Sequence, residues 1–134
     1  MQIHNQALLR STVFLGGNWL AADSGATLAV RDPASGAVLA AVPNCGTNET
    51  RRAIAAADAA LPAWREQTAR QRAKVLQRWL ALINANADDL AQLITAECGK
   101  PLVEAKGEVT YGASFVEWFA EESKRAYGDT IPTP

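Results

Sequence analysis

The sequence predicts two β-hairpins followed by four α-helices, the last of which is the longest. Short apolar segments flank glycine- and proline-containing turns before residue 43, whereas apolar residues recur at helical spacing after residue 47. Gly99 and Pro101 separate the last two helices, because glycine suits a helix C-terminus and proline suits the first turn of the next helix. We therefore expect a small hairpin layer joined to a helical layer.

The hairpins are predicted from turn residues. Strands at 12–15 and 19–21 flank Gly16, Gly17 and Asn18, and strands at 28–32 and 38–42 flank the turn at 33–36. Residues 1–11 precede them and are expected to be a flexible leader. The predicted division of the chain is thus a leader at 1–11 and one structured unit at 12–134, with hairpins at 12–43 and helices at 47–127.

The first three helices are predicted from caps and stripes. Thr47 is expected to cap a helix that Pro62 ends or kinks, and its inner stripe is Thr50, Ile54, Ala57 and Leu61. Thr68 and Gln71 match a capping box that opens the second helix, which should bury Leu76, Trp79, Leu80 and Ile83. Asn86 is expected to cap a third helix that buries Leu90, Leu93 and Ile94 and ends at Gly99.

The last helix is predicted to run from Leu102 to Tyr127 and to be apolar on two faces. One stripe contains Leu102, Ala105, Val109, Gly112, Val116, Phe119, Ser123 and Tyr127. The second contains Val103, Gly107, Tyr111, Phe115 and Trp118, so Trp118 is predicted to be buried. So wide an apolar arc needs more cover than the preceding residues supply, and we expect an isolated segment to expose apolar surface and to self-associate.

Composition excludes several function classes. The chain has 134 residues, 49% hydrophobic and 20% charged, which is typical of a globular domain. A net charge of −1 gives no basic surface for nucleic acid or an anionic membrane, and no segment is apolar enough to cross a bilayer. The first six residues lack a secretory signal pattern. We expect a cytoplasmic protein with no nucleic-acid or membrane partner.

Nucleophilic and metal chemistry are poorly supported by the residues present. Cys45 and Cys98 lie far apart, and His4 is the single histidine, so neither a disulfide framework nor a zinc site is expected. We predict that neither cysteine is a catalytic nucleophile. The C-terminus of a helix disfavours a thiolate at Cys98, and Cys45 lies in a loop before a helix. Glutamates 117, 121 and 122 fit a solvated face paired with Lys124 and Arg125 better than paired-carboxylate catalysis.

Several motifs occur in the order found in one enzyme family: FLGGNW at 14–19, DPASG at 32–36, Trp64, TARQR at 68–72, DDLA at 88–91, ECGKPL at 97–102, GEVTYGASF at 107–115, EWFAEE at 117–122, Arg125, Tyr127 and GDTIP at 128–132. In this order they resemble the N-terminal part of the aldehyde dehydrogenase superfamily, most closely its succinate-semialdehyde dehydrogenase branch. The resemblance implies an α/β fold in the intact protein, of which this chain is the opening piece of the cofactor-binding domain.

The resemblance also implies oxidation of succinate semialdehyde to succinate with NAD or NADP, by a homo-oligomer. The family's nucleophilic cysteine, general base and cofactor-binding residues match no position here, so no catalytic or cofactor-binding residue is assigned. The segment alone is expected to be inactive and to bind no cofactor. The alternative is a non-catalytic helical interaction module that keeps this N-terminal fold, and reading the gene past Pro134 would distinguish the two.

Two family roles fall on residues of this chain. The resemblance places Gly107, Tyr111, Phe115 and Trp118 on the wall of the aldehyde entry tunnel, although ordinary core aromatics give the same pattern. It also places Glu97 at a structural cation held with backbone carbonyls near Val30 and Arg31, although a capping or solvent-facing carboxylate would explain Glu97 equally.

Overall fold

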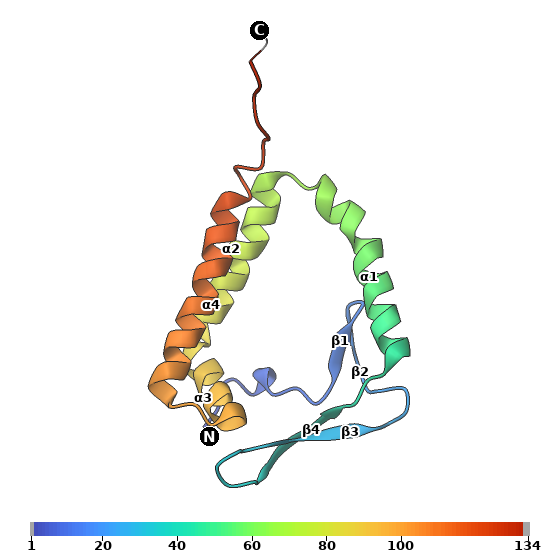
Figure 1. Ribbon diagram of the computed structural model, residues 1–134, viewed down its shortest axis with the longest axis vertical. Helices are drawn as coiled ribbons and strands as arrows, with labels where there is room; N and C mark the ends of the chain where they lie inside the picture. Colours follow the sequence, from blue (N-terminus) through green and yellow to red (C-terminus); the bar gives the residue numbers. More distant parts are fainter. Residues whose placement is uncertain (1, 133–134) are drawn as a thin grey trace.

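The computed structural model describes residues 2–132, so the predicted outer limits at residues 1 and 134 lie outside the described residues. Its elements follow the predicted order, two antiparallel hairpins and then four α-helices (Figure 1). They are η1 (Gln6–Leu8), β1 (Val13–Leu15), β2 (Asn18–Leu20), β3 (Thr27–Arg31), β4 (Val38–Pro43), α1 (Thr47–Glu66), α2 (Ala69–Ala85), α3 (Ala87–Cys98) and α4 (Leu102–Glu122). Within residues 2–132, no helix has both the length and the apolar character that a bilayer crossing requires.

Both hairpins form around the predicted turns. Gly16 and Gly17 adopt φ values of 57° and 88° between β1 and β2, a region in which a side chain would be strained. The β3–β4 turn is closed by the Asp32 carboxylate, which accepts hydrogen bonds from the Ala34 N–H at 2.9 Å and the Ser35 hydroxyl at 2.6 Å. Local chemistry therefore determines both turns.

Helix α1 differs from its prediction at its N-terminus. Gly46, not Thr47, is the N-cap residue, and Glu49 accepts a hydrogen bond from the Gly46 N–H at 3.0 Å. The helix passes through Pro62 and ends at Glu66. Pro62 removes one hydrogen bond, but Asp58, four residues earlier, is exposed, so water can satisfy its carbonyl.

The predicted inner stripe of α1 is exposed, so that prediction was wrong. Ile54 is 64% exposed and Leu61 is 47% exposed. Figure 1 shows the reason: α1 stands apart from the other helices and approaches only the hairpins near its N-terminus. A sequence stripe identifies an apolar face, but a neighbouring element must exist to bury it.

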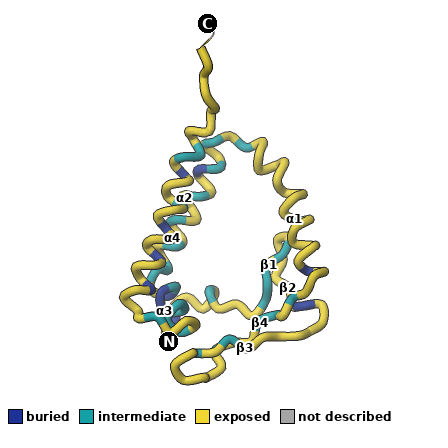
Figure 2. Tube along the Cα trace, viewed as in Figure 1, coloured by how far each residue is buried: buried dark blue, intermediate teal, exposed yellow. Residues whose placement is uncertain are grey.

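The other helices form the core. Helix α2 begins with the predicted capping box, in which the Thr68 N–H donates to the Gln71 side chain at 2.8 Å. Helices α2 and α4 lie side by side and antiparallel, and α3 packs beside the start of α4 (Figure 1). The buried residues gather along this contact (Figure 2), with Ala91, Ala105 and Val109 at the centre of the cluster.

The buried residues of α2 and α4 are mostly small. Ala105 and Val109 of the predicted stripe are buried in the cluster with Ala91, and Ala73, Ala113 and Ala120 are buried as well. In contrast, Trp79 is 55% exposed and Trp118 is 61% exposed, so both predictions of burial were wrong for this chain. No element of residues 2–132 covers the face of α4 that carries Trp118.

The junctions of α3 and α4 follow the sequence only in part. Gly99 ends α3 in the left-handed conformation at φ 75°, as predicted, and Pro101 precedes α4 as its N-cap residue. Asn86 is the N-cap residue of α3 by position, but its side chain donates to the Leu82 carbonyl at 2.7 Å and does not cap α3.

The end of α4 also differs. It lies at Glu122, before the predicted end at Tyr127, and the Ser123 hydroxyl that follows donates to the Ala120 carbonyl at 2.8 Å. The helix of 21 residues is therefore roughly 31 Å long at about 1.5 Å per residue.

Candidate functional site

The residues predicted to line a tunnel share one face of α4. Tyr111, Phe115 and Trp118 are 66%, 47% and 61% exposed, and the Tyr111 and Phe115 rings meet edge to face with centroids 4.9 Å apart. Gly107 lies one turn before Tyr111, and a Cβ atom there would meet nothing within 4 Å. This aromatic face, defined by Gly107, Tyr111, Phe115 and Trp118, is open along its length.

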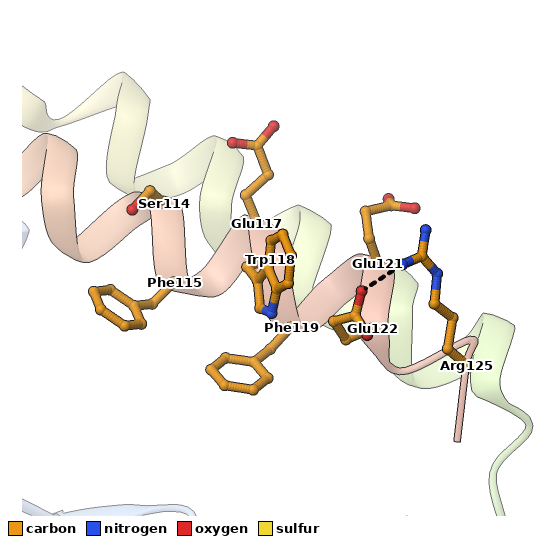
Figure 3. Close-up of a pocket in the computed structure, with 8 residues that line it drawn as sticks. All are labelled: Ser114, Phe115, Glu117, Trp118, Phe119, Glu121, Glu122 and Arg125. Atoms are coloured by element: carbon orange, nitrogen blue, oxygen red, sulfur yellow. Dashed lines mark hydrogen bonds and ion pairs between the residues drawn. The ribbon is translucent and has the colours of Figure 1, made fainter. Parts of the chain in front are cut away.

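A pocket of about 640 Å³ lies at the C-terminal end of the aromatic face (Figure 3). Its wall brings Phe115 and Trp118 together with Phe119, which the sequence placed on the other stripe. Gly107 and Tyr111 do not line it. The remaining lining residues are polar: Ser114, Glu117, Glu121, Glu122 and Arg125. The pocket therefore offers an apolar wall with a charged rim.

Two of the three glutamates predicted to pair form ion pairs, whereas Glu117 forms none with residues 2–132. Glu121 contacts Lys124 at 2.8 Å, and Glu122 contacts Arg125 at 2.9 Å, both at helical spacing. The hydrogen bond from Lys124 is the main reason that the pKa of Glu121 lies below its ordinary value. A carboxyl group held ionised is a poor proton donor near neutral pH, so Glu121 is not suited to acid catalysis.

The cysteines show no nucleophile geometry. Cys98 is exposed, and its thiol donates to the Ile94 carbonyl at 2.9 Å within α3. Cys45 is partly buried in the segment before α1. That neither is catalytic stays a prediction.

Glu97 is exposed and lines two pockets, one between α3 and α4 and one of about 340 Å³ between α3, the β3–β4 hairpin and residues 8–11. Val30 lines the latter pocket, so the fold brings together the two positions at which a cation site was predicted. Residues 2–132 contain no group of three or more histidine, cysteine or acidic side chains that could hold a metal. One carboxylate with backbone carbonyls suits a weakly held hard cation and not zinc, and Arg10 on the same wall opposes a high charge.

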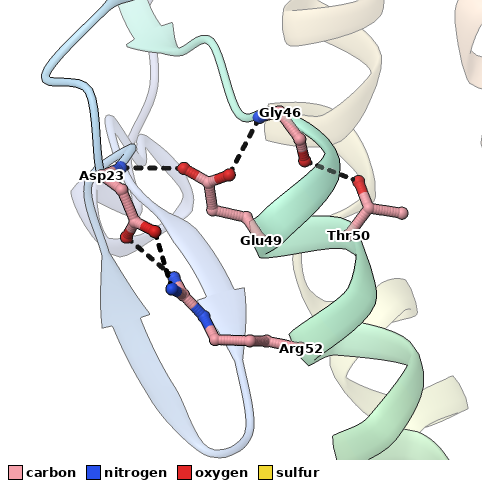
Figure 4. A network of polar contacts seen from close by, with 5 residues as sticks. All are labelled: Asp23, Gly46, Glu49, Thr50 and Arg52. Atoms are coloured by element: carbon pink, nitrogen blue, oxygen red, sulfur yellow. Dashed lines mark hydrogen bonds and ion pairs between the residues drawn. The ribbon is translucent and has the colours of Figure 1, made fainter.

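A polar network fixes the start of α1 and was missed by the sequence analysis (Figure 4). Arg52 donates two hydrogen bonds to the Asp23 carboxylate, at 2.6 and 2.8 Å. Glu49 is buried and accepts from the Asp23 N–H at 2.8 Å as well as from Gly46. These backbone hydrogen bonds, that from Asp23 first, hold the pKa of Glu49 below its ordinary value.

The network joins residues 26 and 29 positions apart. Only Glu49 in the first helical turn gave a sequence signal for it. The contacts tie the β2–β3 connection to α1, so their role is positioning.

Comparison with known proteins identifies relatives across almost the whole chain. The sequence model described as "Aldehyde dehydrogenase family" matches residues 19–134. Glutarate-semialdehyde dehydrogenase of Pseudomonas putida is 58% identical over 132 residues, covering 98% of this chain and 28% of that protein. Succinate-semialdehyde dehydrogenase [NADP(+)] of Escherichia coli is 53% identical, covering 98% of this chain and 27% of that protein.

Solved structures give the same result. The crystal structure of succinate-semialdehyde dehydrogenase from Burkholderia pseudomallei has a TM-score of 0.95 and 56% identity, covering 100% of this chain and 28% of that one. More distant matches include PnpE in complex with nicotinamide adenine dinucleotide, at 25% identity and a TM-score of 0.88 over 94% of this chain and 26% of that one. The chain thus spans about 28% of the length of the first curated relative.

Proposed function

The chain belongs to the aldehyde dehydrogenase family, and on that premise we propose that it is the N-terminal segment of an NAD- or NADP-dependent enzyme oxidising succinate semialdehyde to succinate. The observation that carries the proposal is identity above 50% to named semialdehyde dehydrogenases over nearly all of this segment. The reaction consumes the aldehyde, water and the oxidised cofactor, and it yields the carboxylate, the reduced cofactor and protons. NAD or NADP accepts the hydride when bound.

Glutarate semialdehyde is the second candidate substrate, because the relative named for it has the higher identity, 58% against 53%. The two substrates differ by one methylene, which a pocket distinguishes only about 10- to 200-fold. We expect the full-length protein to have its highest kcat/KM with one of these two, and a much lower value with butanal, which lacks the distal carboxylate. Equal kcat/KM for butanal would contradict the proposed substrate class.

We propose that the aromatic face of α4 forms part of the aldehyde entry wall. Its support is that the four predicted residues lie on one face and are uncovered in this segment. In a full-length protein, Phe115→Ala should raise KM for the semialdehyde more than it lowers kcat, because the ring contacts substrate on its way to the reacting atoms. Thr110→Ala, an exposed position on the same helix, is the matched control.

We propose that Glu97 is a ligand of a structural cation. The support is that Glu97 and Val30 line one pocket. In thermal unfolding of the protein, K⁺, Na⁺ or Mg²⁺ should raise Tm, since a ligand of the folded state stabilises it by mass action, and Glu97→Gln should remove the rise. A rise of the same size in Glu97→Gln would exclude this carboxylate as the ligand.

The rival proposal is a non-catalytic helical interaction module. Turnover of either semialdehyde by the protein carrying this segment would exclude that rival. A cytoplasmic location and a homo-oligomeric state also belong to the proposal, and cell fractionation and light scattering test them.

A further inference from the structure

Residues 2–11 cross from α3 to the hairpins as one extended segment, which we call the strap. Figure 1 shows it leaving the side of α3, forming η1 and continuing to β1. Residues 1–11 were expected to be a flexible leader. Within this leader, Gln2 and Asn5 form hydrogen bonds to residues more than 80 positions away, and Ile3 is buried.

Asp89 anchors the start of the strap. This buried residue lies in the first turn of α3, where the helix dipole favours a carboxylate. Its carboxylate accepts the Asn5 N–H at 2.7 Å and the His4 N–H at 3.0 and 3.1 Å. Without an acceptor there, two backbone donors of the docked strap would lose their partners, which favours the undocked state.

Two further contacts repeat this pattern along α3. The Gln2 N–H donates to the Gln92 side chain at 2.8 Å, one turn after Asp89. The Asn5 side chain donates to Asn86 at 2.7 Å, one turn before it. The strap therefore follows the helix with its hydrogen bonds directed to α3 side chains, and Asp89 is the charged acceptor at the middle.

The far end of the strap is held by an aromatic ring. The Arg10 guanidinium lies 4.8 Å from the centroid of the Trp19 ring in β2, within the range of a cation–π contact. Between the two ends, residues 8–11 form one wall of the pocket that Glu97 and Val30 also line. The position of the strap therefore decides whether that pocket is closed on this side.

We propose that residues 2–11 are a strap latched by the Asp89 carboxylate at one end and by Arg10 on Trp19 at the other, and that unlatching Asp89 opens the Glu97 pocket. The latch needs a carboxylate and not only a polar group. An amide at position 89 would direct its N–H₂ group at one of the backbone donors, and two donors repel each other.

Trypsin cleavage after Arg10 measures the opening, because the strap must leave both the ring and the pocket wall before a protease can bind it. The readout is the rate of cleavage after Arg10 divided by the rate after Arg78, an exposed residue within α2. Global unfolding exposes both sites together, so a rise in the ratio reports opening of the strap alone. We expect Asp89→Asn to raise the Arg10-to-Arg78 cleavage ratio about tenfold, in line with the loss of hydrogen bonds to a charged acceptor.

Asp88→Asn is the matched control. Asp88 is the neighbouring carboxylate of the same turn, but it is 76% exposed and pairs with Lys106 at 2.7 Å, so its variant should leave the ratio within twofold. Ile3→Ser is a second test that leaves the helices intact, and it too should raise the ratio. An unchanged ratio in either Asp89→Asn or Ile3→Ser, or an equal rise in Asp88→Asn, would overturn the proposal. The outcome does not depend on dehydrogenase activity.

Discussion

Substitution of Gly99 by alanine should destabilise the protein through two separable effects. Gly99 has φ of 75°, which costs a residue with a side chain about 1–2 kcal/mol. A Cβ atom there would also lie 2.9 Å from Cγ of Pro33 in the β3–β4 turn, closer than real Cβ contacts occur. Overpacking of this kind typically costs about 1–3 kcal/mol. The two effects together should lower the free energy of unfolding of the Gly99→Ala variant by roughly 2–5 kcal/mol.

Gly36→Ala isolates the first effect. Gly36 has φ of 72° in the β3–β4 turn, but a Cβ atom there would meet nothing within 4 Å. Gly36→Ala should therefore lower the free energy of unfolding by about 1–2 kcal/mol. Urea unfolding of the two variants, compared at equal m-values, measures the difference.

The contact with Pro33 can be tested directly. In a Pro33→Ala background, which removes the Cγ atom that a Cβ at position 99 would meet, Gly99→Ala should cost less than it does alone, and the double-mutant cycle gives the coupling. Equal losses for Gly99→Ala and Gly36→Ala, with no coupling to Pro33, would refute the close approach of the hairpin to the end of α3.

Three further predictions concern stability. Thr68→Ala removes the capping box of α2 and should lower the free energy of unfolding in urea by about 1 kcal/mol. An unchanged free energy of unfolding would contradict the observed cap. Trp118→Ala should cost under about 1 kcal/mol in this segment, because the indole is 61% exposed, against about 3–5 kcal/mol for a buried tryptophan. The pKa of Glu49 in the folded protein lies below its ordinary value of 4.5. The ionised Glu49 carboxylate therefore stabilises the folded state fully above pH 4.5, and this stabilisation is lost as the pH falls through the lower folded-state pKa. Glu49→Gln should therefore flatten the acid limb of a stability–pH curve, and an unchanged limb would exclude Glu49 as a contributor.

Local features of this fold could be predicted from the sequence because their causes are local. The β3–β4 turn, the Thr68 cap and the left-handed Gly99 each depend on residues within five positions of one another. The same holds for the ion pairs of Glu121 and Glu122 at the end of α4. These features need no knowledge of the tertiary fold.

Burial could not be predicted in the same way, because it depends on which elements are present to cover a face. The stripes on α1 and α4 are apolar, yet Ile54 and Trp118 are exposed within the described segment. Ala113 and Ala120 are buried although neither belongs to a predicted stripe, since an alanine gives little signal of which face is apolar. The contacts of Asp89 and Asp23 join distant residues, so only the structure reveals them.

Reduction of NAD or NADP by the full-length protein that carries this segment, with succinate semialdehyde and glutarate semialdehyde as substrates, tests the central claim most directly. The account predicts turnover with at least one of the two, at a kcat/KM well above that for butanal, and no turnover by residues 1–134 alone. A folded full-length protein that oxidises neither semialdehyde, or an isolated segment that does, would contradict it.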